Sequence, residues 1–174
     1  YAMIGCLVGS EMCIRARESA GKVPKEQWYN LARFIHFDRD NFREALNVLE
    51  LLIMYYPKKQ YWVQASHLYG EEKDEARQLA LLEATYEQNL LDRSQDIVLI
   101  SQLYLQAEVP YPAARAMEKG LADDIVEKES KNYELAGVAW RQAQEVTKSL
   151  PMLEAAASKS ETVSYTHLRA HETA

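Results

Sequence analysis

Apolar side chains recur through the middle of the chain at intervals of three and four residues. One such series is Trp28, Leu31, Ala32 and Ile35, and the next is Ala45, Leu46, Leu49, Leu52 and Ile53. Residues at these spacings share one face of an α-helix, so each series predicts an amphipathic helix of about 12 to 15 residues. Polar turns at 38–41 and 71–74 and prolines at 24, 57, 110 and 112 separate the series. Proline is tolerated in such links and at helix starts, because its missing N–H costs little there.

The same pattern returns four times. Its copies are Trp28 to Ile35, Trp62 to Tyr69, Ile97 to Tyr104 and Tyr133 to Trp140. Their small residues Ala32, Ser66, Ser101 and Gly137 stand 34, 35 and 36 positions apart. A second helical series accompanies three copies: Ala45, Leu49 and Leu52; Ala113, Met117 and Gly120; Ser149, Leu153 and Ala156. In the second copy, Ala80 and Ala84 would supply the small positions if the preceding turn were about two residues longer.

Four copies in phase resemble the tetratricopeptide repeat, in which a Trp-x2-Leu-Gly-x2-Tyr helix precedes an Ala-x3-Phe-x2-Ala-x4-Pro helix. The resemblance covers about residues 25–158, although no single copy holds the Trp, Gly and Pro of the motif together. It implies an all-α fold, an α-α superhelix of stacked antiparallel helix pairs. The expected repeat domain is 16–162, with repeats at about 25–58, 59–93, 94–129 and 130–162.

The two ends of the chain have an unexpected relationship. One set of codons for Leu7 to Arg15 has a reverse complement that encodes the nine residues Ser164 to Glu172. No folding principle makes two protein ends mutually antisense, so residues 1–15 and 163–174 are expected to be translated sequencing adapter. This interpretation removes Cys6 and Cys13, and it removes His167 and His171, whose spacing would otherwise suit zinc.

Composition excludes further classes. The chain has 20 basic and 26 acidic residues and a net charge of −6. Without the expected adapter segments the net charge stays −6, so there is no basic surface for a phosphate backbone, and nucleic acid is not an expected partner. The N-terminal apolar run is too short to span a membrane.

Candidate chemistry is sparse. His36, Asp38 and Asp40 form the one cluster that resembles metal ligands, but a calcium loop counted from Asp38 would place Arg43 and Leu49 where glycine and a carboxylate belong. No nucleophile–base pair has distinctive spacing, and the six glycines form no phosphate loop. The tryptophans fall on repeat-core positions. We therefore expect no catalytic residue, no metal and no cofactor.

The resemblance does imply a binding surface, because the first helix of each repeat lines the concave groove in this family. The family's groove positions correspond here to Tyr29, Arg33, His36, Gln60, Val63, His67, Gln95, Val98, Gln102, Leu105, Lys131, Glu134, Val138 and Arg141. Chaperone-binding members have a Lys/Asn clamp for a terminal carboxylate, and Tyr29 and Arg33 stand where its first Lys and Asn would be. That specialised function is not expected.

The leading hypothesis is a non-catalytic bacterial scaffold that binds a protein or peptide in this groove. The stretches YPKKQYWVQAS, VPYPAARAMEKGL and KNYELAG are similar to repeat proteins accompanying TonB and ExbB systems, which would suggest an envelope complex in the periplasm or cytoplasm. Two alternatives stay open: a regulatory arm of a larger enzyme, and a self-associating solenoid whose last repeat exposes its apolar face.

Overall fold

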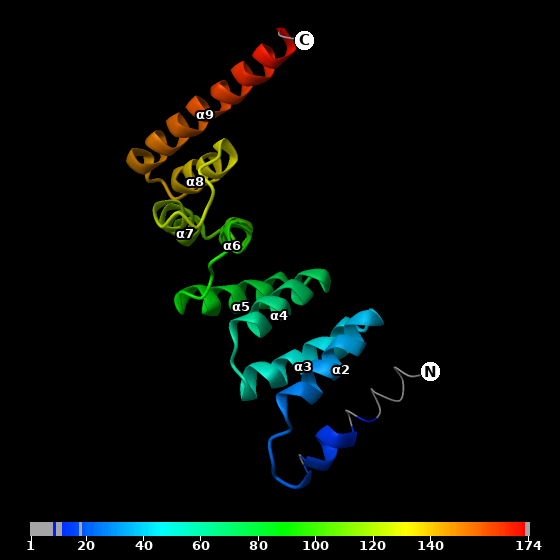
Figure 1. Cartoon of the computed structure of the whole chain (residues 1–174). Helices are drawn as coiled ribbons and strands as arrows, with labels where there is room; N and C mark the ends of the chain where they lie inside the picture. Colours follow the sequence, from blue (N-terminus) through cyan, green and yellow to red (C-terminus); the bar gives the residue numbers. More distant parts are fainter. Residues whose placement is uncertain (1–8, 10–11, 18, 173–174) are drawn as a thin grey trace. The chain divides into compact units, whose positions relative to one another are not determined.

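The computed structural model describes residue 9, residues 12–17 and residues 19–172, with side chains as far as residue 160. The described residues form helices and no strand, so the expected all-α class is confirmed. The helices that carry the repeats are α2 Glu26–Asp38, α3 Phe42–Tyr55, α4 Lys59–Glu71, α5 Glu75–Glu87, α6 Ser94–Gln106, α7 Pro110–Ala122, α8 Ser130–Gln142 and α9 Val146–Glu172 (Figure 1). Helix α9 continues into the C-terminal segment for which an adapter origin is expected from the sequence.

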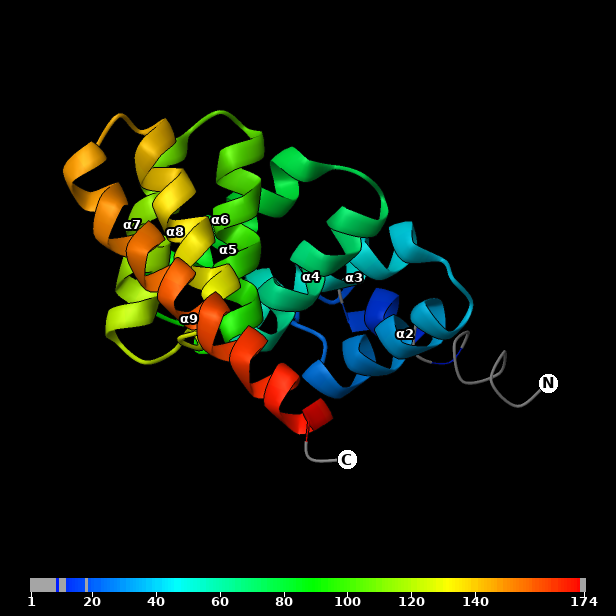
Figure 2. The same cartoon turned by 90° about the horizontal axis from the view of Figure 1, so that it is seen from above.

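The chain divides into two compact units, residues 1–90 and residues 91–174. The first contains the hairpins α2–α3 and α4–α5, and the second contains α6–α7 and α8–α9. Within each unit the second helix of one hairpin also packs on the first helix of the next. Figures 1 and 2 show this for the second unit, where α8 lies between α7 and α9.

All four hairpins turn in the same way. Each turn has one residue in the left-handed region: Asp40, Lys73, Glu108 and Gln144, with φ of 55°, 60°, 60° and 63°. The next residue donates its backbone N–H to a carbonyl five positions back, as from Asn41 to His36 at 3.0 Å and from Glu145 to Trp140 at 2.9 Å. This is the Schellman pattern, which satisfies carbonyls at the helix end. These turns therefore mark the true register of the repeats.

That register corrects the first repeat. The turn residues stand 33, 35 and 36 positions apart, and so do the first residues of the helices in each hairpin. In the sequence pattern the first interval is 34, because Trp28 there corresponds to Trp62. The structure pairs Tyr29 with Trp62 instead. A one-residue slip rotates a helical position by about 100°, which is enough to exchange an outer face for an inner one.

The second helix of the second repeat also differs from expectation. Its inward residues are Gln78, Leu82 and Thr85, while Ala80 is exposed, and the turn before it is no longer than the others. The bulky Gln78 fits at a small position because the facing residue on α4 is Gly70. A Cβ there would lie 2.7 Å from Gln78 Nε2. In this hairpin the small residue lies on the first helix and the large one on the second, so the two helices still pack closely.

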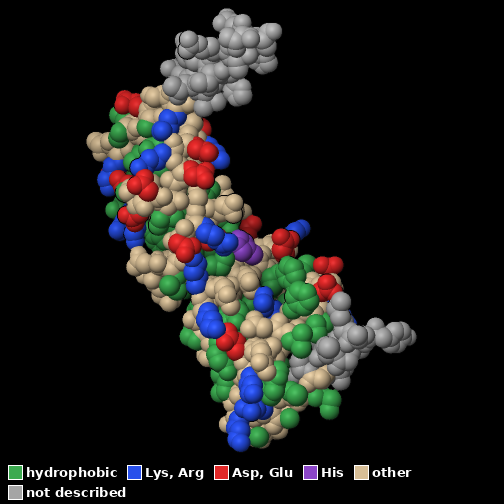
Figure 3. Space-filling model, viewed as in Figure 1, with side chains coloured by type: hydrophobic (Ala, Val, Ile, Leu, Met, Phe, Trp, Pro, Cys, Tyr) green, Lys and Arg blue, Asp and Glu red, His purple; other side chains and the backbone are tan. Residues whose placement is uncertain are grey.

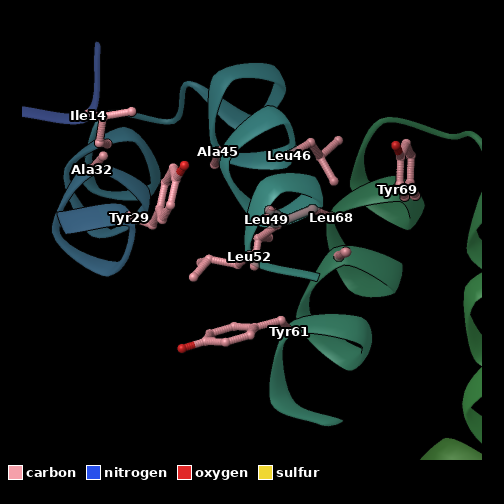
Figure 4. Packing of buried hydrophobic residues seen from close by; sticks show 11 residues of the cluster. Ile14, Tyr29, Ala32, Ala45, Leu46, Leu49, Leu52, Tyr61, Leu68 and Tyr69 are labelled. Carbon is pink, nitrogen blue, oxygen red and sulfur yellow. The ribbon is translucent and has the colours of Figure 1, made fainter. Parts of the chain in front are cut away.

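The core of the first unit combines side chains from three helices. Leu49 and Leu52 of α3 are enclosed between Tyr29 of α2 and Tyr61 of α4 (Figure 4). Each fully buried leucine contributes about 1.5–3 kcal/mol. Ile14, from the segment before α2, packs on the same cluster. Within each unit the repeat period thus has its expected physical cause, since the second helix of one hairpin packs on the first helix of the next.

The same unit keeps several large apolar side chains in solvent. Phe34 and Phe37 of α2 and Met54 of α3 are 59%, 54% and 69% exposed. Hydrophobic side chains are visible on the surface of this unit in Figure 3. Phe37 contacts Phe42 edge-on, with ring centroids 6.0 Å apart. Part of the apolar surface of α2 and α3 therefore stays in contact with solvent.

Candidate binding groove of the second unit

A groove of about 510 Å³ lies between α6 and α8 of the second unit. Its walls combine carboxamide, charged and aliphatic side chains. The lining residues are Ser94, Gln95, Val98, Gln102, Glu127, Lys131, Asn132, Glu134, Leu135 and Val138. Peptide-binding sites commonly have this mixture, in which apolar contacts give affinity and a few polar groups set orientation.

Helical spacing brings these side chains to one surface. Gln95, Val98 and Gln102 are three and four residues apart, so they form a stripe along α6. One repeat later, Lys131, Glu134 and Val138 form the matching stripe along α8. The groove runs along both stripes, and its length from Ser94 to Gln102 is about 12 Å at the rise of an α-helix.

Two buried polar residues secure the N-terminal ends of the two helices. Asn132 is 4% exposed, and its Nδ2 donates to the Glu127 carbonyl at 2.8 Å. Asp96, 1% exposed and one repeat earlier, accepts from Arg93 Nε at 2.9 Å and from Arg93 Nη2 at 3.2 Å. These contacts fix the first turns of α6 and α8 at one end of the groove.

Lys131 has a charged partner beside the groove. Its Nζ lies 2.8 Å from a carboxylate oxygen of Glu129. The hydrogen bond raises the pKa of Lys131, and the same bond lowers the pKa of the Glu129 carboxyl. Both side chains are at least half exposed, so solvent weakens the pair.

Six of the eight groove residues named for this unit from the sequence line the groove: Gln95, Val98, Gln102, Lys131, Glu134 and Val138. The other two lie apart from it. Leu105 is half-buried, and Arg141 is exposed one helical turn beyond Val138. Four further lining residues were not predicted from the sequence: Ser94, Glu127, Asn132 and Leu135. Leu135 could have been found from its helical spacing to Val138, whereas the others depend on how the ends of the two helices pack.

The first unit does not present the surface that was expected. Tyr29, His36 and Val63 are only 0%, 8% and 4% exposed, so the expectation that they face a partner is wrong. For Tyr29 and His36 the reason is the one-residue slip in register. The positions equivalent to the groove residues of the second repeat are Gln27, Asn30 and Phe34, of which Gln27 and Phe34 are exposed. Gln60 and His67 are exposed, as expected.

A chain of hydrogen bonds crosses from α2 to α4 in this unit. Tyr61 donates its hydroxyl to Glu26 at 2.5 Å and accepts from Asn30 Nδ2 at 2.9 Å. Arg33 is half-buried and donates to both Asn30 and Gln64, and its burial lowers its pKa. Most of these polar groups are paired with one another, apart from the buried Arg33 Nε, so fewer of them are free to bind a partner.

The first unit also has a cavity of about 540 Å³ between α3, α4 and the start of α5. Tyr69 donates its hydroxyl to Glu50, and the Arg77 guanidinium lies 5.6 Å from the Tyr69 ring centroid. Burial, followed by the bond to Glu50, raises the pKa of Tyr69. Arg77 also pairs with Asp74 at 3.4 Å. Because its charged groups are largely paired with one another, this cavity is a weaker candidate than the groove.

The residues considered for metal binding do not come together. No group of three or more His, Cys, Asp or Glu side chains gathers among the described residues. His36 is buried, whereas Asp38 and Asp40 are exposed. Cys13 is an exposed free cysteine. Cys6 lies outside the described residues, and the side chains of His167 and His171 also lie outside them. Within the described part of the chain, no helix is both long and apolar enough to cross a membrane.

Solved structures with this arrangement of helices are known. A crystal structure of MamA matches with a TM-score of 0.62, covering 94% of this chain and 91% of that one at 12% identity. MamA from Desulfovibrio magneticus RS-1 matches with a TM-score of 0.56, covering 79% and 77% at 13% identity. A putative kinesin light chain with TPR-like repeats from Podosopora anserina matches at 0.53, covering 91% and 88% at 11% identity.

No family model matches the sequence, and no curated protein matches it. At identities this low, the likeness establishes the fold alone. The chain therefore has a tetratricopeptide-like helical repeat fold, as the sequence predicted.

Proposed function

We propose that this protein is a non-catalytic scaffold that binds a short extended segment of a partner protein in the groove between α6 and α8. The observation that carries the proposal is the groove itself. It combines an aliphatic floor with the exposed carboxamides of Gln95 and Gln102. Neither carboxamide has a hydrogen-bond partner among the described residues.

Carboxamides suit a peptide backbone because each offers two donors and one acceptor. An extended partner segment has unpaired N–H and C=O groups along its backbone, and these can pair with such side chains whatever the amino-acid sequence of the partner. A groove about 12 Å long accommodates about three or four residues at about 3.3 Å per residue. So short a segment is expected to bind weakly, and repeated engagement would strengthen its attachment.

A non-catalytic role is supported by the chemistry of the groove lining. Its titratable groups are Glu127, Lys131 and Glu134, all exposed to solvent. A general acid or base usually has a pKa shifted toward neutrality by burial or by a like charge. Lys131 has the opposite environment, since its carboxylate partner favours the charged form.

The experiment is a binding assay on the full chain with a library of acetylated, amidated hexapeptides that vary at every position. We expect selected peptides to bind, Val138→Glu to abolish that binding, and Gln102→Ala to weaken it. Gln142→Ala is the matched control, because Gln142 is exposed on the same helix and does not line the groove. Circular dichroism verifies that each variant is folded. Binding that survives Val138→Glu would contradict the proposal.

Association with an envelope energy-transduction complex is a further part of the proposal. It is supported by the three stretches that resemble repeat proteins of the TonB and ExbB systems, such as KNYELAG at the start of α8. Affinity purification from a Gram-negative host tests it. Recovery of cytosolic partners only would count against an envelope location and would leave the peptide groove unaffected.

A further inference from the structure

The charges around the groove are unbalanced. Glu134 is exposed in the lining, and no described residue pairs with it. Glu127 is a second carboxylate in the lining, and the one lysine there, Lys131, already has Glu129 as its partner at 2.8 Å. Glu127, Glu129 and Glu134 thus contribute three carboxylates in and beside the lining, against the one ammonium group of Lys131. A cationic side chain entering this end of the groove would meet a net negative charge.

The aliphatic part of the lining lies next to these carboxylates. Val98 of α6 and Leu135 and Val138 of α8 are all half-buried, so they can cover one aliphatic side chain of a guest. Glu134 precedes Val138 by one helical turn, or about 6 Å along the axis. In an extended strand, side chains two positions apart share a face and are separated by about 6.6 Å. The two spacings match.

The opposite end of the aliphatic strip has a different charge. Arg141 is exposed one turn beyond Val138, outside the groove lining. A basic residue placed there would be repelled, whereas one placed beside Glu134 would be attracted. A bound strand with one basic side chain thus has a preferred direction along α8.

We propose that the groove selects extended segments in which an aliphatic residue and a lysine or arginine stand two positions apart. The aliphatic side chain occupies the Val98–Leu135–Val138 strip, and the cation lies beside Glu134. This inference rests on the proposed peptide-binding function, because it specifies which peptides the groove takes.

Four capped heptapeptides with a glycine-serine background test it on the full chain by fluorescence anisotropy at 50 mM and 1 M NaCl. The first carries Leu and Arg two positions apart, the second has Glu in place of Arg, the third has Leu and Arg adjacent, and the fourth has Arg without Leu. We expect the first to bind most tightly. The glutamate peptide should bind about two- to five-fold more weakly at low salt, which is the range for exposed ion pairs, and the difference should shrink at high salt.

A pair of variants assigns the preference to one residue. Glu134→Gln should reduce the preference for arginine over glutamate and retain binding of the leucine peptides. The control Glu154→Gln, at an exposed position on α9 outside the groove lining, should leave the preference intact. Equal or tighter binding of the glutamate peptide, or of the adjacent-spacing peptide, would overturn this inference while the peptide-binding function stands. If none of the four binds and the hexapeptide library also yields no binder, both are wrong.

Discussion

Gly137→Ala is expected to destabilise the second unit, although alanine is ordinarily the better helix former. A Cβ at Gly137 would lie 2.7 Å from both Cδ2 and Cγ of Leu153 and 3.2 Å from its backbone N. Carbon atoms in contact prefer about 3.5–4.0 Å, so α8 and α9 would have to separate by several tenths of an ångström. The same crossing is joined by Ser149 Oγ, which donates to the Gly137 carbonyl at 2.8 Å.

The expected magnitude follows from two opposing effects. Replacing glycine in a helix interior gains about 1 kcal/mol from reduced chain entropy. Overpacking a close helix crossing costs about 1–3 kcal/mol, and the upper part of the range applies because Leu153 meets the new carbon with its branch point and backbone, which cannot rotate away. The free energy of unfolding should therefore fall by about 1–2 kcal/mol.

The assay is guanidinium unfolding followed by tryptophan fluorescence. Trp140 is the one tryptophan after residue 90, and it is fully buried in the second unit. In a background carrying Trp28→Phe and Trp62→Phe, its emission reports the second unit alone. The midpoint should move to lower denaturant with an unchanged slope, which identifies a change of stability rather than of the denatured state.

The control is Gly70→Ala in the first unit. Its Cβ would also lie 2.7 Å from a neighbour, but that neighbour is Nε2 at the tip of the Gln78 side chain. A flexible tip can rotate, so the steric cost should roughly cancel the helix-propensity gain of about 1 kcal/mol. Circular dichroism measures this variant in the unaltered chain. The reasoning is refuted if Gly137→Ala is neutral or stabilising, or if Gly70→Ala is the more damaging of the two.

Two other predictions concern single contacts. Ser101 is fully buried and donates to the Ala113 carbonyl of α7 at 3.2 Å. Ser101→Ala should lower the free energy of unfolding by about 1 kcal/mol, because the hydrogen bond is lost, and Ser101→Leu should lower it by about 1–3 kcal/mol, because the crossing is overpacked. Chemical unfolding measures both. Hydrogen bonds from Lys58 and then Tyr61 lower the pKa of Glu26. A carboxyl group whose pKa is lowered by folding stabilises the folded state at pH values above the pKa that it has in the unfolded chain, which is about 4.3. This stabilisation is lost as the pH falls from there through the pKa of the folded state. Glu26→Gln should therefore flatten the acid limb of the Tm–pH curve, and an unchanged limb would contradict the assignment.

Much of the fold could be predicted because it depends on short-range pattern. Residues three and four apart share a helical face whatever surrounds them, so the apolar series identified the helices, and their recurrence identified the repeats. The same periodicity also predicted residues that line the groove of the second unit, among them Gln95, Gln102 and Val138. Those predictions needed only the helix geometry and one correct register.

Other features were decided by contacts between helices. The sequence alone favoured pairing Trp28 with Trp62, because the two residues are identical. In the structure the turn at Asp40 sets the register one residue away, and Tyr29 is buried. Likewise, Gln78 occupies a small position, and the residue that faces it across the crossing is Gly70. The sequence by itself determined that the chain would form helices in a four-fold repeat, and only the tertiary structure decided which helix faces lie open, because openness depends on how neighbouring helices share the space between them.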